Sequence, residues 1–91
     1  MARKDVWQEL QALRRRIHNV KPWEIENLAK KAGWVWQNTT GSHATYVKEG
    51  FPSVLTIKLH GLSGGLARSL LRIIEASLHE EGVNDDGEEA G

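Results

Sequence analysis

The sequence contains no cysteine, and its 91 residues include just two prolines, one phenylalanine, one tyrosine and one methionine. Without cysteine the chain has no disulfide, no thiolate ligand for a metal and no cysteine nucleophile, so we expect a core held by packing alone and a reducing, cytoplasmic setting. No apolar run approaches 18 residues, which excludes a membrane-spanning helix. The start, from Met1 to Asp5, lacks the pattern of a signal peptide. These absences predict one small cytoplasmic domain.

The formal net charge is zero, but the charges are unevenly distributed. Residues 1–31 hold eight Lys or Arg and four acids. Residues 32–79 hold four Lys or Arg and two acids, and residues 80–91 hold six acids and no Lys or Arg. A positively charged body attracts a polyanion such as RNA at moderate ionic strength. A solvated basic helix face with an acidic solubility tail would give the same distribution.

Apolar residues at helical spacing predict three helices. They span residues 5–18, 22–32 and 66–80. Pro22 suits the first position of the second helix, and Gly33 suits the position just past its end. Trp7 and Trp23 are expected in the core or at a helix junction. Residues 82–91 have one branched apolar side chain, Val83, so we predict that they are disordered.

Between the second and third helices the apolar period changes from 3.6 to 2, which predicts strands. Residues 34–37 begin the first predicted strand, and the other two strands span residues 43–48 and 54–59, with turns at 38–42 and 49–52. This order predicts an α+β fold: a three-stranded antiparallel sheet with helices on one face and the other face open. Trp34 and Trp36 share a face, which either covers the core or offers a stacking platform for bases, and core packing is favoured.

The tripeptide Gly41-Ser42-His43 opens the second predicted strand. Glycine permits a turn with positive φ, serine can bond the turn backbone, and histidine is then held on a rigid strand. Because histidine titrates near working pH, a positioned imidazole can take or give a proton in phosphodiester cleavage. His43 is therefore a candidate catalytic residue, although a lone histidine at a strand start is more often structural.

His60 is the second candidate catalytic residue. If the second and third strands pair around a turn centred between Phe51 and Pro52, His43 and His60 lie opposite each other, with β-carbons about 4.5 to 5.5 Å apart. Two imidazoles at that distance could divide the acid and base roles or bind a metal, and a metal is disfavoured because no third ligand has suitable spacing. Alternatively, His60 bonds the loop before the last helix.

Residues 21–79 resemble the HicA-type, or YcfA-like, toxins of bacterial toxin–antitoxin pairs. The matching landmarks are Lys21-Pro22, Lys31-Ala32-Gly33-Trp34, Gly41-Ser42-His43, Tyr46, Leu59-His60 and the helix from Leu66 to Ile74. Thr39 and Thr40 stand where the family usually has a basic residue. The resemblance divides the chain into an N-terminal helical extension (1–20), a HicA-like domain (21–80) and a disordered acidic tail (81–91).

The resemblance implies a double-stranded-RNA-binding-domain-like fold, ribosome-independent cleavage of mRNA, neutralisation by a HicB-type antitoxin, and an essential histidine at His43. We therefore predict a metal-independent endoribonuclease that needs no cofactor, because the nucleophile is the ribose 2′-hydroxyl of the substrate. The predicted RNA-binding residues are Gly41, Ser42, Lys48, Lys58, Arg68 and Arg72. Two other functions fit the same features: an RNA-binding domain without catalysis, and an interaction module that docks a protein through the open sheet.

Overall fold

The computed structural model describes residues 3–83 and has three α-helices and three strands in that range. The elements are α1 (Arg3–Arg15), the 3₁₀ helix η1 (Ile17–Asn19), α2 (Pro22–Lys31), β1 (Val35–Thr40), β2 (His43–Val47), β3 (Leu55–Lys58) and α3 (Gly64–Glu80). The strands form an antiparallel sheet in the order β1-β2-β3. This confirms the predicted α+β fold, and the order from α2 to α3 is that of a double-stranded-RNA-binding-like domain.

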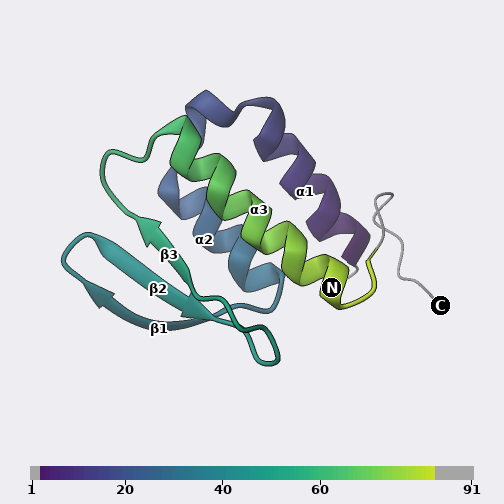
Figure 1. Cartoon of the computed structure of the whole chain (residues 1–91). Helices are drawn as coiled ribbons and strands as arrows, with labels where there is room; N and C mark the ends of the chain where they lie inside the picture. The colour runs from purple at the N-terminus through teal and green to yellow at the C-terminus, as the bar shows by residue number, and fades with distance from the viewer. Residues whose placement is uncertain (1–2, 84–91) are drawn as a thin grey trace.

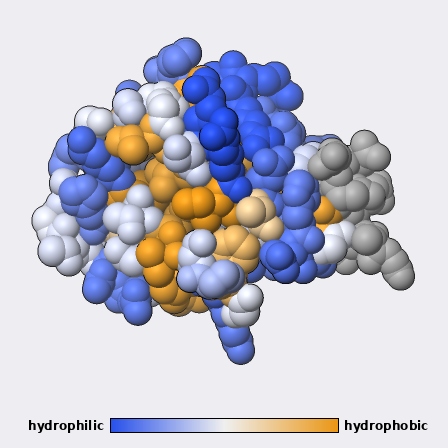
Figure 2. Space-filling view, viewed as in Figure 1, coloured by the Kyte–Doolittle hydropathy of each residue, from blue (hydrophilic) through white to orange (hydrophobic). Residues whose placement is uncertain are grey.

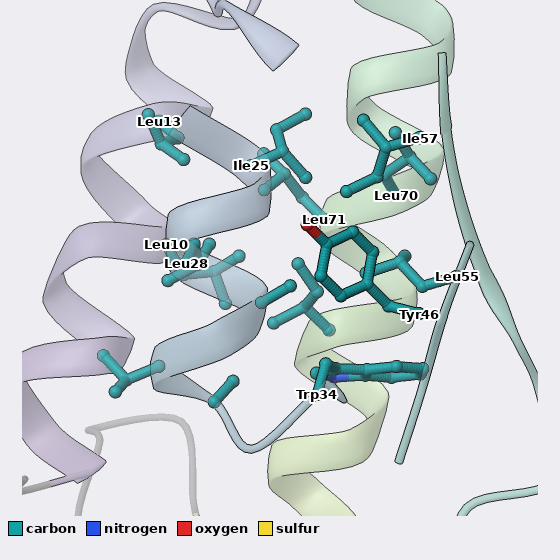
Figure 3. Packing of buried hydrophobic residues seen from close by; sticks show 14 of the residues in the cluster. Leu10, Leu13, Ile25, Leu28, Trp34, Tyr46, Leu55, Ile57, Leu70 and Leu71 are labelled. Carbon is teal, nitrogen blue, oxygen red and sulfur yellow. The ribbon is translucent and has the colours of Figure 1, made fainter. Parts of the chain in front are cut away.

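The helices lie on one side of the sheet (Figure 1). α2 and α3 contact the strands, and α1 packs against these two helices. Figure 3 shows Leu10 and Leu13 of α1 facing α2, with Tyr46, Leu55 and Ile57 of the sheet on the far side of the same cluster. The sequence predicted α1 as an extension, but its apolar residues belong to the one hydrophobic core. In Figure 2 hydrophobic atoms gather where α3 runs beside the sheet, whereas hydrophilic atoms dominate over α1.

The boundaries of α2 follow the sequence signals. Pro22 is its first residue, and the backbone N–H of Lys21 donates to Glu24 Oε1 at 2.9 Å, which satisfies one of the free donors at the helix start. At the other end Gly33 has a φ of 96°, a conformation that side-chain-bearing residues rarely adopt. The chain thus leaves the helix at the predicted residue and enters the sheet through Trp34.

The first strand is longer than the sequence indicated. Residues 38–40 were expected to form a turn because of their Asn-Thr-Thr composition, yet β1 continues to Thr40. The ladder with β2 accommodates an irregularity between Trp36 and Asn38, where an extra residue lets the strand bend and stay paired. The turn itself is confined to Gly41 and Ser42, and Gly41 supplies the positive φ of 58°.

The register between β2 and β3 differs from the expected one by two residues. His43 lies opposite Lys58, and Tyr46 lies opposite Leu55, so the expected pairing of His43 with His60 is wrong. The reason is a tight turn that starts earlier than expected: the N–H of Phe51 donates to the carbonyl of Lys48 at 3.1 Å. A shift of two residues keeps every side chain on its predicted face, because the pleat repeats every two residues.

The four tryptophans occupy different environments. Trp7 and Trp34 are buried, and the indole N–H of Trp34 donates to Ser77 Oγ at 3.2 Å. Trp23 was expected in the core or at a helix junction, but 61% of its surface is exposed because α2 buries the opposite stripe against the sheet. Trp36 is 54% exposed because the helices do not cover β1, all of whose residues are exposed. Trp34 therefore fits the core reading and Trp36 does not.

The residues just after α3 are ordered, which corrects the expected start of the disordered tail. Val83 is buried, its N–H donates to the carbonyl of Leu78 at 3.0 Å, and Glu81 pairs with Arg3 and Lys48. Glu81 and Val83, two residues of the predicted tail, therefore belong to the folded domain at the end of α3. The rest of that tail, residues 84–91, lies outside the described residues. No helix within residues 3–83 is long and apolar enough to span a bilayer.

Candidate functional site

The sheet face turned away from the helices carries His43 and a single lysine. The side chains on this face follow from the strand pairing: Val35, Asn38, Thr40, His43, Thr45, Val47, Thr56 and Lys58. None of these residues is a carboxylate, so within the described strands the open face is neutral to positive. Such a surface accepts a phosphate strand without like-charge repulsion.

His43 is the first residue of β2 and sits between both neighbouring strands. Thr40 of β1 lies opposite it on one side and Lys58 of β3 on the other. Its ring is exposed, and no side chain of residues 3–83 forms a hydrogen bond with it. The Gly41-Ser42 turn immediately precedes it, and the carbonyl of Ser42 accepts from the N–H of Leu59 at 2.7 Å. The strand pairing thus fixes the backbone of His43 while the imidazole stays accessible to a ligand.

His60 lies past the end of β3 and lines a pocket at the same end of the sheet. The pocket has a volume of about 330 Å³ and is walled by residues 18–22 and 59–62. His60 is exposed and faces residues that precede α2, among them His18 and Lys21. The structure therefore separates the two candidate catalytic histidines: His43 belongs to the ladder and His60 to the pocket rim.

The side chain of Lys48 does not lie on the same side of the sheet as His43. Its ammonium forms an ion pair with Glu81 at 2.7 Å and contacts Ser77 Oγ at 3.4 Å, and its side chain is 9% exposed. Both partners belong to the helical side of the molecule, whereas His43 is on the open face. A phosphate contact by Lys48 would require this pair to break, so its geometry is that of a structural residue.

Arg68 and Arg72 are exposed one turn apart on α3. Because α3 covers the opposite face of the sheet, a strand of RNA that touches His43 would have to pass round the end of the sheet to reach them. Their predicted role in RNA binding stays a prediction. Gly41 and Ser42, by contrast, form the turn beside His43, as the sequence indicated.

Many other cations are held by carboxylates. Arg14 donates to both oxygens of Glu75, at 2.9 and 2.6 Å, and these hydrogen bonds hold the pKa of Glu75 below its usual range. Arg16 pairs with Glu24, and this hydrogen bond likewise lowers the pKa of Glu24. Lys31 pairs with Glu9 at 2.9 Å. These pairs neutralise charge around the helices. Lys58, by contrast, lies opposite His43 on the open face of the sheet.

Sequence reasoning missed His18 as a site residue. It precedes α2 in the chain, so no strand or helix period connects it with His60, and only the fold brings η1 next to the loop after β3. The one sequence signal for this role is that His18 lies three residues before Lys21-Pro22, the start of α2. Within residues 3–83 no group of three or more His, Asp or Glu side chains is arranged to hold a metal ion.

The fold and site together define a small α+β domain with double-stranded-RNA-binding-like topology and an exposed histidine at the start of its middle strand. A family model described as the HicA toxin of bacterial toxin–antitoxin systems matches residues 24–77, more than half of the chain. The chain belongs to this HicA toxin family. No curated protein and no solved structure gives a significant match. The matched residues include the whole sheet and exclude α1, η1 and the first residues of α2.

Proposed function

We propose that this HicA-family toxin is an endoribonuclease that cleaves mRNA in the cytoplasm through acid–base catalysis by His43. The observation that carries the proposal is the placement of His43: an exposed imidazole on a rigid strand, opposite Lys58, on a sheet face whose described strand residues include no carboxylate. A phosphodiester that lies across this face meets a proton-transfer group and a positive charge together. Membership of a toxin family for which RNA is the expected target supports the same function.

In the proposed reaction the substrate supplies its own nucleophile. His43 accepts the proton of a ribose 2′-hydroxyl, the 2′ oxygen forms a bond to the adjacent phosphorus, and the bond from phosphorus to the 5′ oxygen of the next nucleotide breaks. The leaving 5′ oxygen takes a proton from water. The products are a 2′,3′-cyclic phosphate and a 5′-hydroxyl end. No oxidant, reductant or cofactor enters this balance.

Lys58 is the group that we assign to the charge on phosphorus. A second negative charge develops on the non-bridging oxygens as the 2′ oxygen attacks, and a cation fixed nearby stabilises that state more than the ground state. The backbone of Gly41 and Ser42 would place the RNA strand at the end of the sheet. His60 lacks the cross-strand position that a shared acid–base pair with His43 requires, so we assign it to binding at the pocket rim.

The test is RNA cleavage by the purified chain in the presence of a chelator, beside the variant His43→Ala. Removal of a general acid–base group lowers the rate about 100- to 10,000-fold. A matched control is His79→Ala, which removes a histidine from the far end of α3, where its ring contacts that of Trp7 in a tilted arrangement with centroids 5.7 Å apart. Cleavage by His43→Ala at the wild-type rate would overturn the proposal. RNA binding without cleavage by either protein would establish a non-catalytic RNA-binding domain instead.

The second part of the proposal is that the antitoxin is of the HicB type. The open sheet face supports docking of a protein, because β1 is an edge strand and Val35, which lies on this face, is 63% exposed. An antitoxin on this strand would also cover His43. A HicB-type protein from the neighbouring reading frame should form a stoichiometric complex and suppress cleavage. A complex that leaves cleavage unchanged would contradict this assignment.

A further inference from the structure

The pocket beside His60 joins two parts of the chain that lie far apart in sequence. Residues 18–22 come from η1 and the start of α2, and residues 59–62 follow β3. Residues 18–22 lie outside the part that matches the HicA family, so the pocket depends on the N-terminal segment of this chain. Its volume of about 330 Å³ falls at the lower end of the range for small-ligand sites, roughly 300 to 1,000 Å³.

The wall formed by residues 18–22 is held in place by Arg16. Its guanidinium donates to the carbonyl of Asn19 at 3.1 Å and to Glu24 Oε1 at 3.1 Å. These bonds tie η1 to the first turn of α2, and they also neutralise Glu24, the carboxylate that receives the backbone N–H of Lys21. The wall is therefore set before any ligand arrives, which reduces the ordering cost of binding.

The opposite wall connects the pocket with His43. Leu59, in this wall, donates its N–H to the carbonyl of Ser42, the residue before His43. The ammonium of Lys58 lies 3.9 Å from the position that a β-carbon would take on Gly61, another wall residue. Lys58 thus stands between the pocket and His43, its partner across the ladder. A polymer bound at His43 can continue past Lys58 into the pocket.

The histidine at position 18 is set against the start of α3. A β-carbon added to Gly64 would lie 2.7 Å from His18 Nδ1 and 3.2 Å from its Cε1, so the glycine leaves the space that the ring occupies. This contact fixes the ring in the pocket wall. Three residues that can donate hydrogen bonds to an anion, His18, Lys21 and His60, then line one cavity.

Among residues 3–83, no acidic side chain lines the pocket, and the polar residues of its lining are His18, Asn19, Lys21 and His60. A lysine with neighbouring imidazole and amide groups suits an anion with several acceptor oxygens, and a phosphate group has that chemistry. We propose that this pocket binds the phosphate of a nucleotide adjacent to the cleaved one in a single-stranded RNA substrate. The inference rests on the proposed function, since it assumes that RNA lies across His43.

The first test measures binding of a single-stranded RNA oligonucleotide to proteins that carry His43→Ala, so that the RNA stays intact. Adding Lys21→Gln should weaken binding about threefold to tenfold. It should also reduce the slope of log affinity against log salt by about 0.7, the value for one lost phosphate contact to a single strand. The matched control is Lys30→Gln, which removes the same charge about 14 Å further along α2. Equal effects of the two substitutions would overturn the inference.

The second test moves His18 without changing a charge. Gly64→Ala places a methyl group against the ring of His18, whereas Gly65→Ala meets no atom closer than Ser63 Oγ at 4.0 Å. Neither glycine has a positive φ, so both variants should fold. We expect weaker RNA binding for Gly64→Ala and unchanged binding for Gly65→Ala. Unchanged binding in both variants would count against a role for the His18 wall.

A third measurement separates RNA from a free phosphate compound as the source of the ligand. Inorganic phosphate titrated into the wild-type chain should shift the NMR signals of His18 and His60, and Lys21→Gln should reduce the shift. If phosphate binds but Lys21→Gln leaves RNA affinity equal to that of Lys30→Gln, the pocket serves a free phosphate compound and the inference fails. Cleavage assays with His43→Ala read out the proposed function independently, so the two failures are distinguishable.

Discussion

His43 and Lys58 lie directly opposite each other in the β2–β3 ladder, on the face that the helices leave open. Opposed residues in an antiparallel pair have β-carbons about 4.5 to 5.5 Å apart, so a single phosphodiester can contact both side chains. The pairing gives each residue a separate task. The imidazole takes and gives a proton, while the ammonium of Lys58 supplies the positive charge that stabilises the phosphorane.

We expect Lys58→Gln to lower the turnover number of RNA cleavage by about 100- to 1,000-fold, the range for loss of one group that stabilises transition-state charge. The Michaelis constant should change much less, because the charge on phosphorus grows during the reaction. Steady-state kinetics with a short RNA measure both parameters. Lys30→Gln controls for net charge and should keep wild-type turnover; an equal loss in both variants would refute the assignment.

A second expectation concerns Lys48, which the sequence placed in the RNA-binding set. Its side chain is 9% exposed and its ammonium pairs with Glu81 at 2.7 Å, so Lys48→Met should lower the free energy of unfolding by about 1 to 3 kcal/mol. Urea denaturation followed by circular dichroism measures this loss. At saturating RNA the folded variant should cleave at the wild-type rate. A large loss of turnover with unchanged stability would return Lys48 to the active site.

The ion pair between Arg14 and Glu75 links α1 to α3 and should make stability depend on pH. The hydrogen bonds from Arg14 lower the pKa of Glu75, so at acid pH the unfolded chain takes up a proton that the folded chain does not. The contribution is fully present above the unfolded pKa, about 4.3, and is lost as the pH falls through the lower folded pKa.

Glu75→Gln should therefore cost up to about 1 kcal/mol near pH 7, and the difference from wild type should shrink below about pH 4. Urea midpoints at several pH values measure the change. Arg14→Gln should remove the same pH dependence, because the carboxylate then lacks its partner. A difference that persists at pH 2.5 would mean that Glu75 contributes through packing rather than charge.

The architecture was accessible from the sequence because strong local signals marked it. Pro22 and Gly33 mark the two ends of α2 through their own backbone preferences, which neighbouring residues do not alter. The change of the apolar period at Trp34 indicates the start of the sheet. The register of β2 against β3 was not accessible in this way. It depends on which residues close the turn, and here the bond from Phe51 to Lys48 shortened the hairpin by two positions.

For the same reason, only the local part of the candidate site could be predicted from the sequence. Gly41-Ser42-His43 is a local pattern, and the structure places it at the exposed strand start that the pattern indicates. The pocket is not local: His18 and His60 are 42 positions apart in the chain, and their proximity depends on how η1 packs beside the loop after β3. Burial of Lys48 likewise follows from Glu81, which the sequence assigned to a disordered tail.

The last expectation concerns α1, which the family match leaves out although its side chains complete the core. Leu10 is fully buried among residues of the central cluster, together with Val6 and Leu13 of the same helix. Leu10→Ala should lower the free energy of unfolding by about 2 to 5 kcal/mol, a large part of the stability of a domain of this size. Thermal unfolding measures the loss, and Gln11→Ala on the same helix is the control.

If α1 were an independent extension, Leu10→Ala would leave the melting temperature unchanged. The consequence reaches the site, because α1 leads directly into η1, which forms one wall of the pocket. RNA affinity should therefore fall together with the folded fraction, and measurement at a temperature where the variant is fully folded should restore it. Restored affinity would separate the structural role of α1 from the ligand contacts of His18 and Lys21.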